Sequence, residues 1–140
     1  MDLSIFDDIS STENIFGGND YLSNSELIGH SHSNIFGGDD YSFDGGTEKF
    51  STHDNIFKGK DIFSNGQQIK HSQSNIFGGE NLYDSNNQPV SHSEHNIFGG
   101  DNIFDASGEM IAQTSPNIFG GYDIDPLKSF DLSMIPSFSL

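Results

Sequence analysis

The sequence predicts an all-β repeat protein, and three observations lead to this prediction. The pentapeptide NIFGG occurs five times, a sixth copy reads NIFKG, and neighbouring copies begin 20 or 21 residues apart. Short runs rich in Ile, Phe and Tyr alternate with Gly, Asn, Asp and Ser, which is the pattern of strands and turns. No stretch places apolar residues at i, i+3, i+4 and i+7 over the length of a helix.

The repeat unit begins at the Asn of each pentapeptide. The six units start at Asn14, Asn34, Asn55, Asn75, Asn96 and Asn117. After the Gly pair, most units have an acidic or amide pair, an apolar pair, a turn with Gly or Asn, another apolar residue and the dipeptide HS. The predicted organisation is a leader or cap (residues 1–13), a repeat domain (14–121), and a C-terminal cap or docking tail (122–140).

One unit is too small to fold alone, because its few apolar side chains do not offset the entropy lost when its backbone is ordered. The units are therefore expected to share hydrogen bonds and apolar surfaces, as repeat arrays do. Three short strands per unit favour a β-solenoid of about six coils. The alternatives are a ring or propeller-like array of β-hairpins, and a chain that orders only on assembly.

In a solenoid, equivalent residues of successive coils stack, so the pentapeptides would form ladders. The predicted ladder residues are an Asn column and a buried Phe column: Asn14, Phe16, Asn34, Phe36, Asn55, Phe57, Asn75, Phe77, Asn96, Phe98, Asn117 and Phe119. Stacked Asn amides would hydrogen-bond along their column. After the Gly pair, Lys60 would lie between Asp39 and Glu80, where it would relieve repulsion between like charges.

The repeated carboxylates and imidazoles are the candidate metal ligands, although the sequence predicts no metal site and no cofactor. The candidates are Asp39, Asp44, Glu80, Asp84, Asp101, Asp105, His30, His71 and His92. The stretch FGGNDYL is similar to the G-G-x-G-x-D-x-U-x repeats of calcium β-rolls, but its fourth place holds Asp and the period is about 20. Ser51 and Gln113 interrupt the repeated His position.

Composition limits the classes of partner. The formal net charge is −16, Arg and Cys are absent, and phosphate backbones and anionic membranes both need cationic partners. Nucleic-acid binding and membrane insertion are therefore not expected. The N-terminal stretch lacks the basic and apolar regions of a signal peptide, so the default expectation is a cytoplasmic protein, with leaderless export as an alternative.

No nucleophile elbow or nucleotide-binding Gly pattern is present, and an enzyme is not expected. The leading hypothesis is a non-enzymatic, self-assembling structural protein that forms ordered oligomers or fibres. A second is a protein- or glycan-binding module that uses the repeated HS or GGD edges. A third is a calcium-dependent exported repeat protein. The expected partners are further copies of the chain or another protein.

Overall fold

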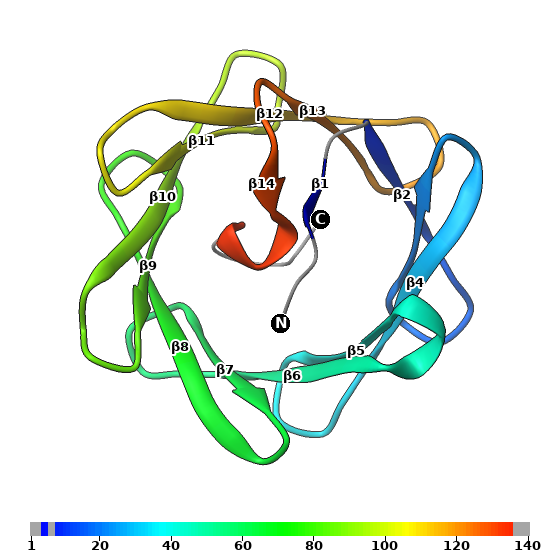
Figure 1. Cartoon of the computed structure of the whole chain (residues 1–140), viewed down its shortest axis with the longest axis horizontal. Coiled ribbons are helices and arrows are strands. Elements are labelled where there is room, and N and C mark those ends of the chain that lie inside the picture. Colours follow the sequence, from blue (N-terminus) through cyan, green and yellow to red (C-terminus); the bar gives the residue numbers. More distant parts are fainter. Residues whose placement is uncertain (1–3, 6–7, 136–140) are drawn as a thin grey trace.

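Twelve strands form one closed antiparallel barrel, drawn as a ring in Figure 1. The computed structural model describes residues 4–5 and 8–135. The barrel strands are β2 (Ile9–Glu13), β3 (Asn19–Ser23), β4 (Glu26–Ser33), β5 (Asp39–Phe43), β6 (Glu48–Asp54), β7 (Lys60–Ser64), β8 (Gln67–Ser74), β9 (Glu80–Asp84), β10 (Pro89–His95), β11 (Asp101–Asp105), β12 (Met110–Pro116) and β13 (Tyr122–Pro126). Strands β1 (Ser4–Ile5) and β14 (Phe130–Asp131) pair with each other within the ring. The described helices are two short 3-10 turns, η1 (Asp44–Gly46) and η2 (Leu132–Met134).

The ring closes between the two ends of the repeat array. Strand β13 pairs with β2, with Ile124 opposite Ile9 and Asp123 opposite Ser10. Five hairpins are continuous in sequence, whereas the sixth combines β13 with β2. Residues 9–13, expected in a leader or cap, therefore form a barrel strand. A stack of coils would leave two unpaired edges, and the ring removes both by joining its end strands.

The all-β class is confirmed, but the solenoid geometry differs from the structure. Consecutive strands pair antiparallel both within and between units, whereas a solenoid would stack equivalent strands of successive units. The hairpin-ring alternative fits this arrangement in part. Both architectures use the same short strands and turns, and short connections between consecutive strands favour antiparallel neighbours.

The apolar core lies inside the barrel and is built mainly from the third residue after each Gly pair. These residues are Tyr21, Tyr41, Ile62, Leu82, Ile103 and Ile124, all buried. The described part of the C-terminal tail adds Phe130, Leu132 and Ile135, which are also buried in this cluster. The tail thus packs within the ring up to that point, and residues 136–140 lie outside the described residues.

The two ends of the barrel differ. Because consecutive strands alternate in direction, all six pentapeptide loops lie at one end, which we call the NIFGG end. The connections between β3 and β4, and between the corresponding strands of the other units, lie at the opposite end, the turn end. Strand β13 finishes and β2 begins at the turn end.

Candidate functional site

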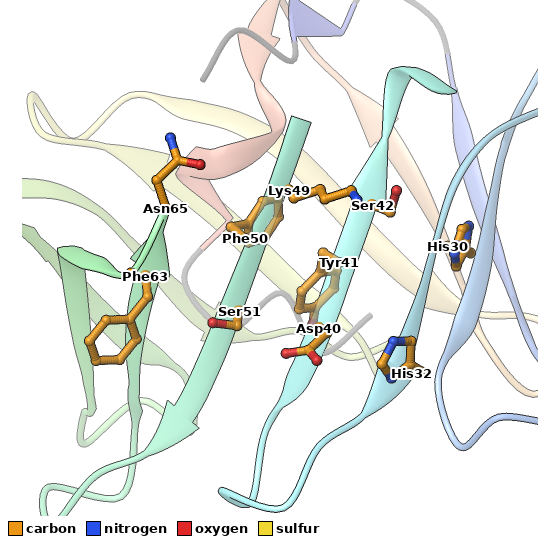
Figure 2. A pocket seen from close by; sticks show the side chains of 11 residues that line it. His30, His32, Asp40, Tyr41, Ser42, Lys49, Phe50, Ser51, Phe63 and Asn65 are labelled. Atoms are coloured by element: carbon orange, nitrogen blue, oxygen red, sulfur yellow. The ribbon is translucent and has the colours of Figure 1, made fainter. Parts of the chain in front are cut away.

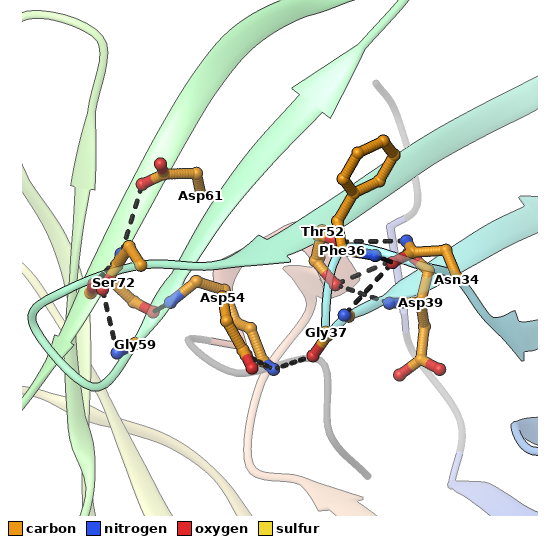
Figure 3. Close-up of polar contacts among 12 residues, drawn as sticks. Asn34, Phe36, Gly37, Asp39, Thr52, Asp54, Gly59, Asp61 and Ser72 are labelled. Atoms are coloured by element: carbon orange, nitrogen blue, oxygen red, sulfur yellow. Dashed lines mark hydrogen bonds and ion pairs between the residues drawn. The ribbon is translucent and has the colours of Figure 1, made fainter.

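The Asn of each NIFGG loop fixes the shape of that loop with four side-chain hydrogen bonds. In the second loop, Asn34 Oδ1 accepts from the backbone N–H groups of Phe36 at 2.9 Å and Gly38 at 3.2 Å. Its Nδ2 donates to the Thr52 carbonyl at 3.0 Å (Figure 3) and to Asp40 Oδ1 at 3.1 Å. The other five loops repeat these four bonds. Each Asn therefore ties its loop to the next hairpin rather than to a stack of amides.

A buried hydroxyl completes each loop. A Ser or Thr stands three residues before every Asn: Ser11, Ser31, Thr52, Ser72, Ser93 and Thr114. Its oxygen accepts the backbone N–H of the residue after a Gly pair, at 2.7–3.0 Å. The reasoning from sequence missed these residues, although their recurrence at a fixed position was the signal. In the sixth unit the hydroxyl comes from Ser11, so the loop of Asn117 closes onto the first barrel strand.

The Ile and Phe of the pentapeptides are exposed. The six Ile side chains are 90–94% exposed and the six Phe side chains 55–65% exposed. We call them the Ile–Phe ring: Ile15, Phe16, Ile35, Phe36, Ile56, Phe57, Ile76, Phe77, Ile97, Phe98, Ile118 and Phe119. The buried Phe column expected from the sequence is thus absent, because these residues lie in the loops beyond the strand ends rather than on the inner face of the sheet.

The Ile–Phe ring is identical in all six units, whereas other surface positions vary. The fourth residue after the Gly pair changes from unit to unit: Leu22, Ser42, Phe63, Tyr83, Phe104 and Asp125. Aromatic side chains expose 150–250 Å² each when free, so the six Phe rings alone leave roughly 500–900 Å² in contact with water. These side chains come from six separate loops, and so much exposed apolar surface is unusual on a folded protein.

The Ile–Phe ring surrounds the open end of the barrel, which we call the mouth. The residue after each Gly pair lies two positions before a core residue and is therefore on the inner face of its strand. These inner residues are Asn19, Asp39, Lys60, Glu80, Asp101 and Tyr122. Their cross-strand neighbours are Glu13, Ser33, Asp54, Ser74, His95 and Pro116. A hollow of about 530 Å³ lies between the first and last loops, with Glu13, Asn19, Asp39 and Tyr122 among its walls.

The mouth is acidic. The inner residues and their cross-strand neighbours include five carboxylates and one ammonium group, that of Lys60; the carboxylates are on Glu13, Asp39, Asp54, Glu80 and Asp101. Lys60 forms an ion pair with Asp54 and donates to the Gly37 carbonyl. Burial raises the pKa of Asp39 and of Glu80, and the Lys60 charge opposes both shifts. Lys60 thus acts on both carboxylates, and it lies between them around the rim of the barrel, with Asp39 on β5, Lys60 on β7 and Glu80 on β9, rather than in a column of stacked coils.

Comparisons with protein-family models, with curated proteins and with solved structures found no match. No helix in the described part of the chain has the length and apolar composition needed to cross a bilayer. What the protein binds must therefore be inferred from its surfaces.

Shallow grooves lie on the outer wall between neighbouring hairpins. One, of about 450 Å³, lies beside β5, β6 and β7, where Asp40, Lys49, Ser51 and Phe63 line it together with His32 (Figure 2). A related groove of about 340 Å³ lies between the β9–β10 hairpin and the turn that follows β11. A third, of about 450 Å³, lies between β4 and η1. The first and third grooves adjoin, because His30, Ser42 and Lys49 line both, so these polar grooves lie in two regions of the described outer wall.

The candidate metal ligands are distributed over both ends and the outer wall. Asp39, Glu80 and Asp101 belong to the mouth, whereas Asp84 and Asp105 accept backbone N–H bonds in turns. Hydrogen bonds, led by the one from Ser107, lower the pKa of Asp105 to about 2. Asp44 begins η1, and His30 lines a groove. The remaining two imidazoles stack on rings, His71 on Tyr83 and His92 on Phe104. Among residues 4–5 and 8–135, no group of three or more His, Asp or Glu is placed to hold a metal ion.

The burial difference predicts opposite effects for two neighbouring substitutions. Phe77→Ala should change the free energy of unfolding by less than about 1 kcal/mol, because the ring is 56% exposed. Leu82→Ala should cost about 2–5 kcal/mol, because that side chain is fully buried. Urea unfolding of both variants measures the difference. A loss of several kcal/mol for Phe77→Ala would show that the loop packs against the barrel.

Proposed function

We propose that the protein is a non-enzymatic docking module that binds another protein through the Ile–Phe ring. The observation that carries the proposal is the near-complete exposure, 90–94%, of an identical Ile in all six loops. Burying one such side chain in an interface contributes about 1.5–3 kcal/mol. Several loops that contact one partner together would thus supply a substantial binding energy.

The loops are suited to this role because their backbones are held in place. The Asn amide and the buried Ser or Thr hydroxyl fix each loop, so little conformational entropy is lost when the Ile and Phe are covered. Within one pentapeptide, Asn and the Gly pair build the loop, whereas Ile and Phe are presented to solvent. This division of roles accounts for the recurrence of the whole pentapeptide.

Self-assembly of the chain has narrower support than binding of a different protein. The fibre hypothesis depended on unpaired strand edges, and each of the twelve described barrel strands has a partner on both sides. Association between copies would therefore use the Ile–Phe ring rather than extension of the sheet. Two such faces would also bring two acidic mouths together, which is unfavourable at low ionic strength.

The test is a variant with Ile→Ser at all six loop positions. Selection of a displayed library of random linear peptides against the native protein should give binders that the variant no longer retains. The melting temperature should stay close to that of the native protein, because exposed side chains add little stability. As a matched control, Leu27→Ser with Leu127→Ser removes two exposed apolar side chains, 60% and 53% exposed, near the turn end. Binders retained by the Ile→Ser variant would refute docking through the ring.

Glycan binding in the outer-wall grooves is a second candidate, favoured by the occurrence of such grooves in two separate regions of the outer wall. Each groove combines hydroxyl, carboxylate, amide or imidazole groups with apolar side chains, a combination typical of sites that orient a polar ligand. Glycan-array binding that Phe63→Ala weakens and the loop Ile→Ser variant does not would support it. An array with no binding above background would remove this candidate.

A further inference from the structure

We infer that the partner bound at the NIFGG end is a basic protein segment with apolar flanks, whose Lys or Arg side chain enters the acidic mouth while its apolar side chains cover the Ile–Phe ring. This inference rests on the proposed docking function and adds the chemistry of the partner. It follows from the arrangement of two surfaces: apolar loops on the outside, and carboxylates on the inner face of the strands that these loops connect.

The carboxylates of the mouth have few cationic partners. Lys60 pairs with Asp54, and His95 Nδ1 lies 2.7 Å from Asp101 Oδ1. Glu80 accepts a hydrogen bond from Ser72 Oγ at 2.8 Å. These contacts leave an excess of negative charge, because the mouth has one Lys and five carboxylates. An entering guanidinium or ammonium group would reduce that excess and form charge-assisted hydrogen bonds.

Partial burial of the mouth carboxylates strengthens their attraction for such a cation. Asp39 and Glu80 are half-buried, and burial raises the pKa of both carboxyl groups. Part of the cost of removing these charges from water is therefore already present in the free protein. Opposite charges attract more strongly in such a partly desolvated site than on an open surface.

The size of the site fits a side chain rather than a folded surface. The hollow beside Asp39 has a volume of about 530 Å³, within the range of about 300–1,000 Å³ that ligand pockets occupy. Tyr122, which lines the hollow, provides an aromatic ring on which Lys and Arg also bind favourably, and the first and last NIFGG loops border it. A basic side chain flanked by apolar residues would contact both parts at once.

Charge separates this partner from the other candidates for the same face. A second copy would place its own carboxylates against the mouth, and the chain carries a net charge of −16. Anionic lipids and nucleic acids carry the same sign of charge and would be repelled. A basic protein segment with apolar flanks is the occupant whose apolar side chains match the loops and whose positive charge matches the acidic mouth.

The experiment compares two charge variants in titrations with synthetic peptides that alternate Leu with Lys, or Leu with Glu. The mouth variant carries Asp39→Asn, Glu80→Gln and Asp101→Asn. The control variant carries Glu26→Gln, Glu48→Gln and Asp125→Asn near the turn end, so the net charge changes equally. We expect the Lys peptide to bind the native protein and the control with affinities within about threefold, and the mouth variant at least about tenfold more weakly. The Glu peptide should not bind.

The outcomes distinguish this inference from the proposed docking function. Equal weakening in both charge variants would assign the attraction to overall charge and overturn a specific role of the mouth. Equal binding of both peptides, lost in the Ile→Ser variant, would leave docking intact and refute the basic partner. Full binding by the Ile→Ser variant would refute docking itself. Sedimentation that showed ring-dependent dimers, or ring-dependent binding to phosphatidylcholine vesicles, would replace the basic segment with a second copy or a lipid surface.

Discussion

Gly79→Ala should destabilise the protein by more than about 3 kcal/mol, above the usual cost of inserting one methyl group. The added Cβ would lie 2.1 Å from the Ser93 carbonyl oxygen and 2.6 Å from its hydroxyl. These two oxygens accept hydrogen bonds from Asn75 and from the backbone of Glu80. The methyl group would therefore displace the junction between the loop and the next hairpin. Thermal and urea unfolding measure the loss.

Gly108→Ala provides the comparison. Gly108 has a positive φ of 89°, but no heavy atom lies within 4 Å of an added Cβ. Its substitution should lower the free energy of unfolding by about 1–2 kcal/mol, the strain of a left-handed backbone, because the added methyl group meets no neighbouring atom. If Gly79→Ala were no more costly than Gly108→Ala, the close approach at Gly79 would have to relax freely, and the second Gly would not be required in the loop.

Removing residues 1–13 should prevent the barrel from closing. Without β2, the edges of β13 and β3 lose their partners, and Asn117 loses the Ser11 carbonyl. Two open edges on one small sheet favour pairing with other chains. We expect the truncated chain to lose its cooperative thermal transition and to form oligomers by sedimentation analysis.

A peptide that supplies the missing strand tests whether the loss is local. Residues 1–14 added as a peptide should restore a single transition to the truncated chain. The same peptide with Ile9→Asp and Ser11→Asp should fail, because both native side chains are buried in the barrel. A truncated chain that stayed monomeric and equally stable would mean that β13 and β3 do not depend on β2.

The strands could be predicted from sequence because their signals are local. Residues 101–105, DNIFD, form β11 and residues 110–116 form β12, as the alternation of apolar and turn residues indicates. The closure could not be read from the same signals, because a stack and a ring use similar strands and turns. One residue in the sequence did indicate the closure. Ser11 stands three residues before the first Asn, in the position that Ser or Thr occupies before each later Asn. That residue marks the leader as half of a hairpin.

The candidate site was harder to predict, because hydrophobic residues are expected inside by default. Phe16 and its five equivalents were assigned to a buried column, whereas the core uses residues such as Leu82 and Ile103. The Gly pairs were the sequence feature that indicated exposure of the Ile and Phe side chains. A Gly pair directly after Ile-Phe places both side chains in a turn, where the strand pattern that would bury them has ended. The acidic mouth forms only when the barrel closes and brings residues of all six units together, so the sequence of one unit could not predict it.

Closure through β2 also affects how the protein is made. Strand β2 leaves the ribosome well before its second partner, β13, which follows only after residue 121. At synthesis rates of about 5–20 residues per second, the nascent chain waits several seconds for that partner. During this interval one edge of β2 is unpaired, and neighbouring nascent chains on one messenger RNA carry the same edge. A net charge of −16 makes such chains repel one another, and this repulsion opposes pairing between them before each ring closes.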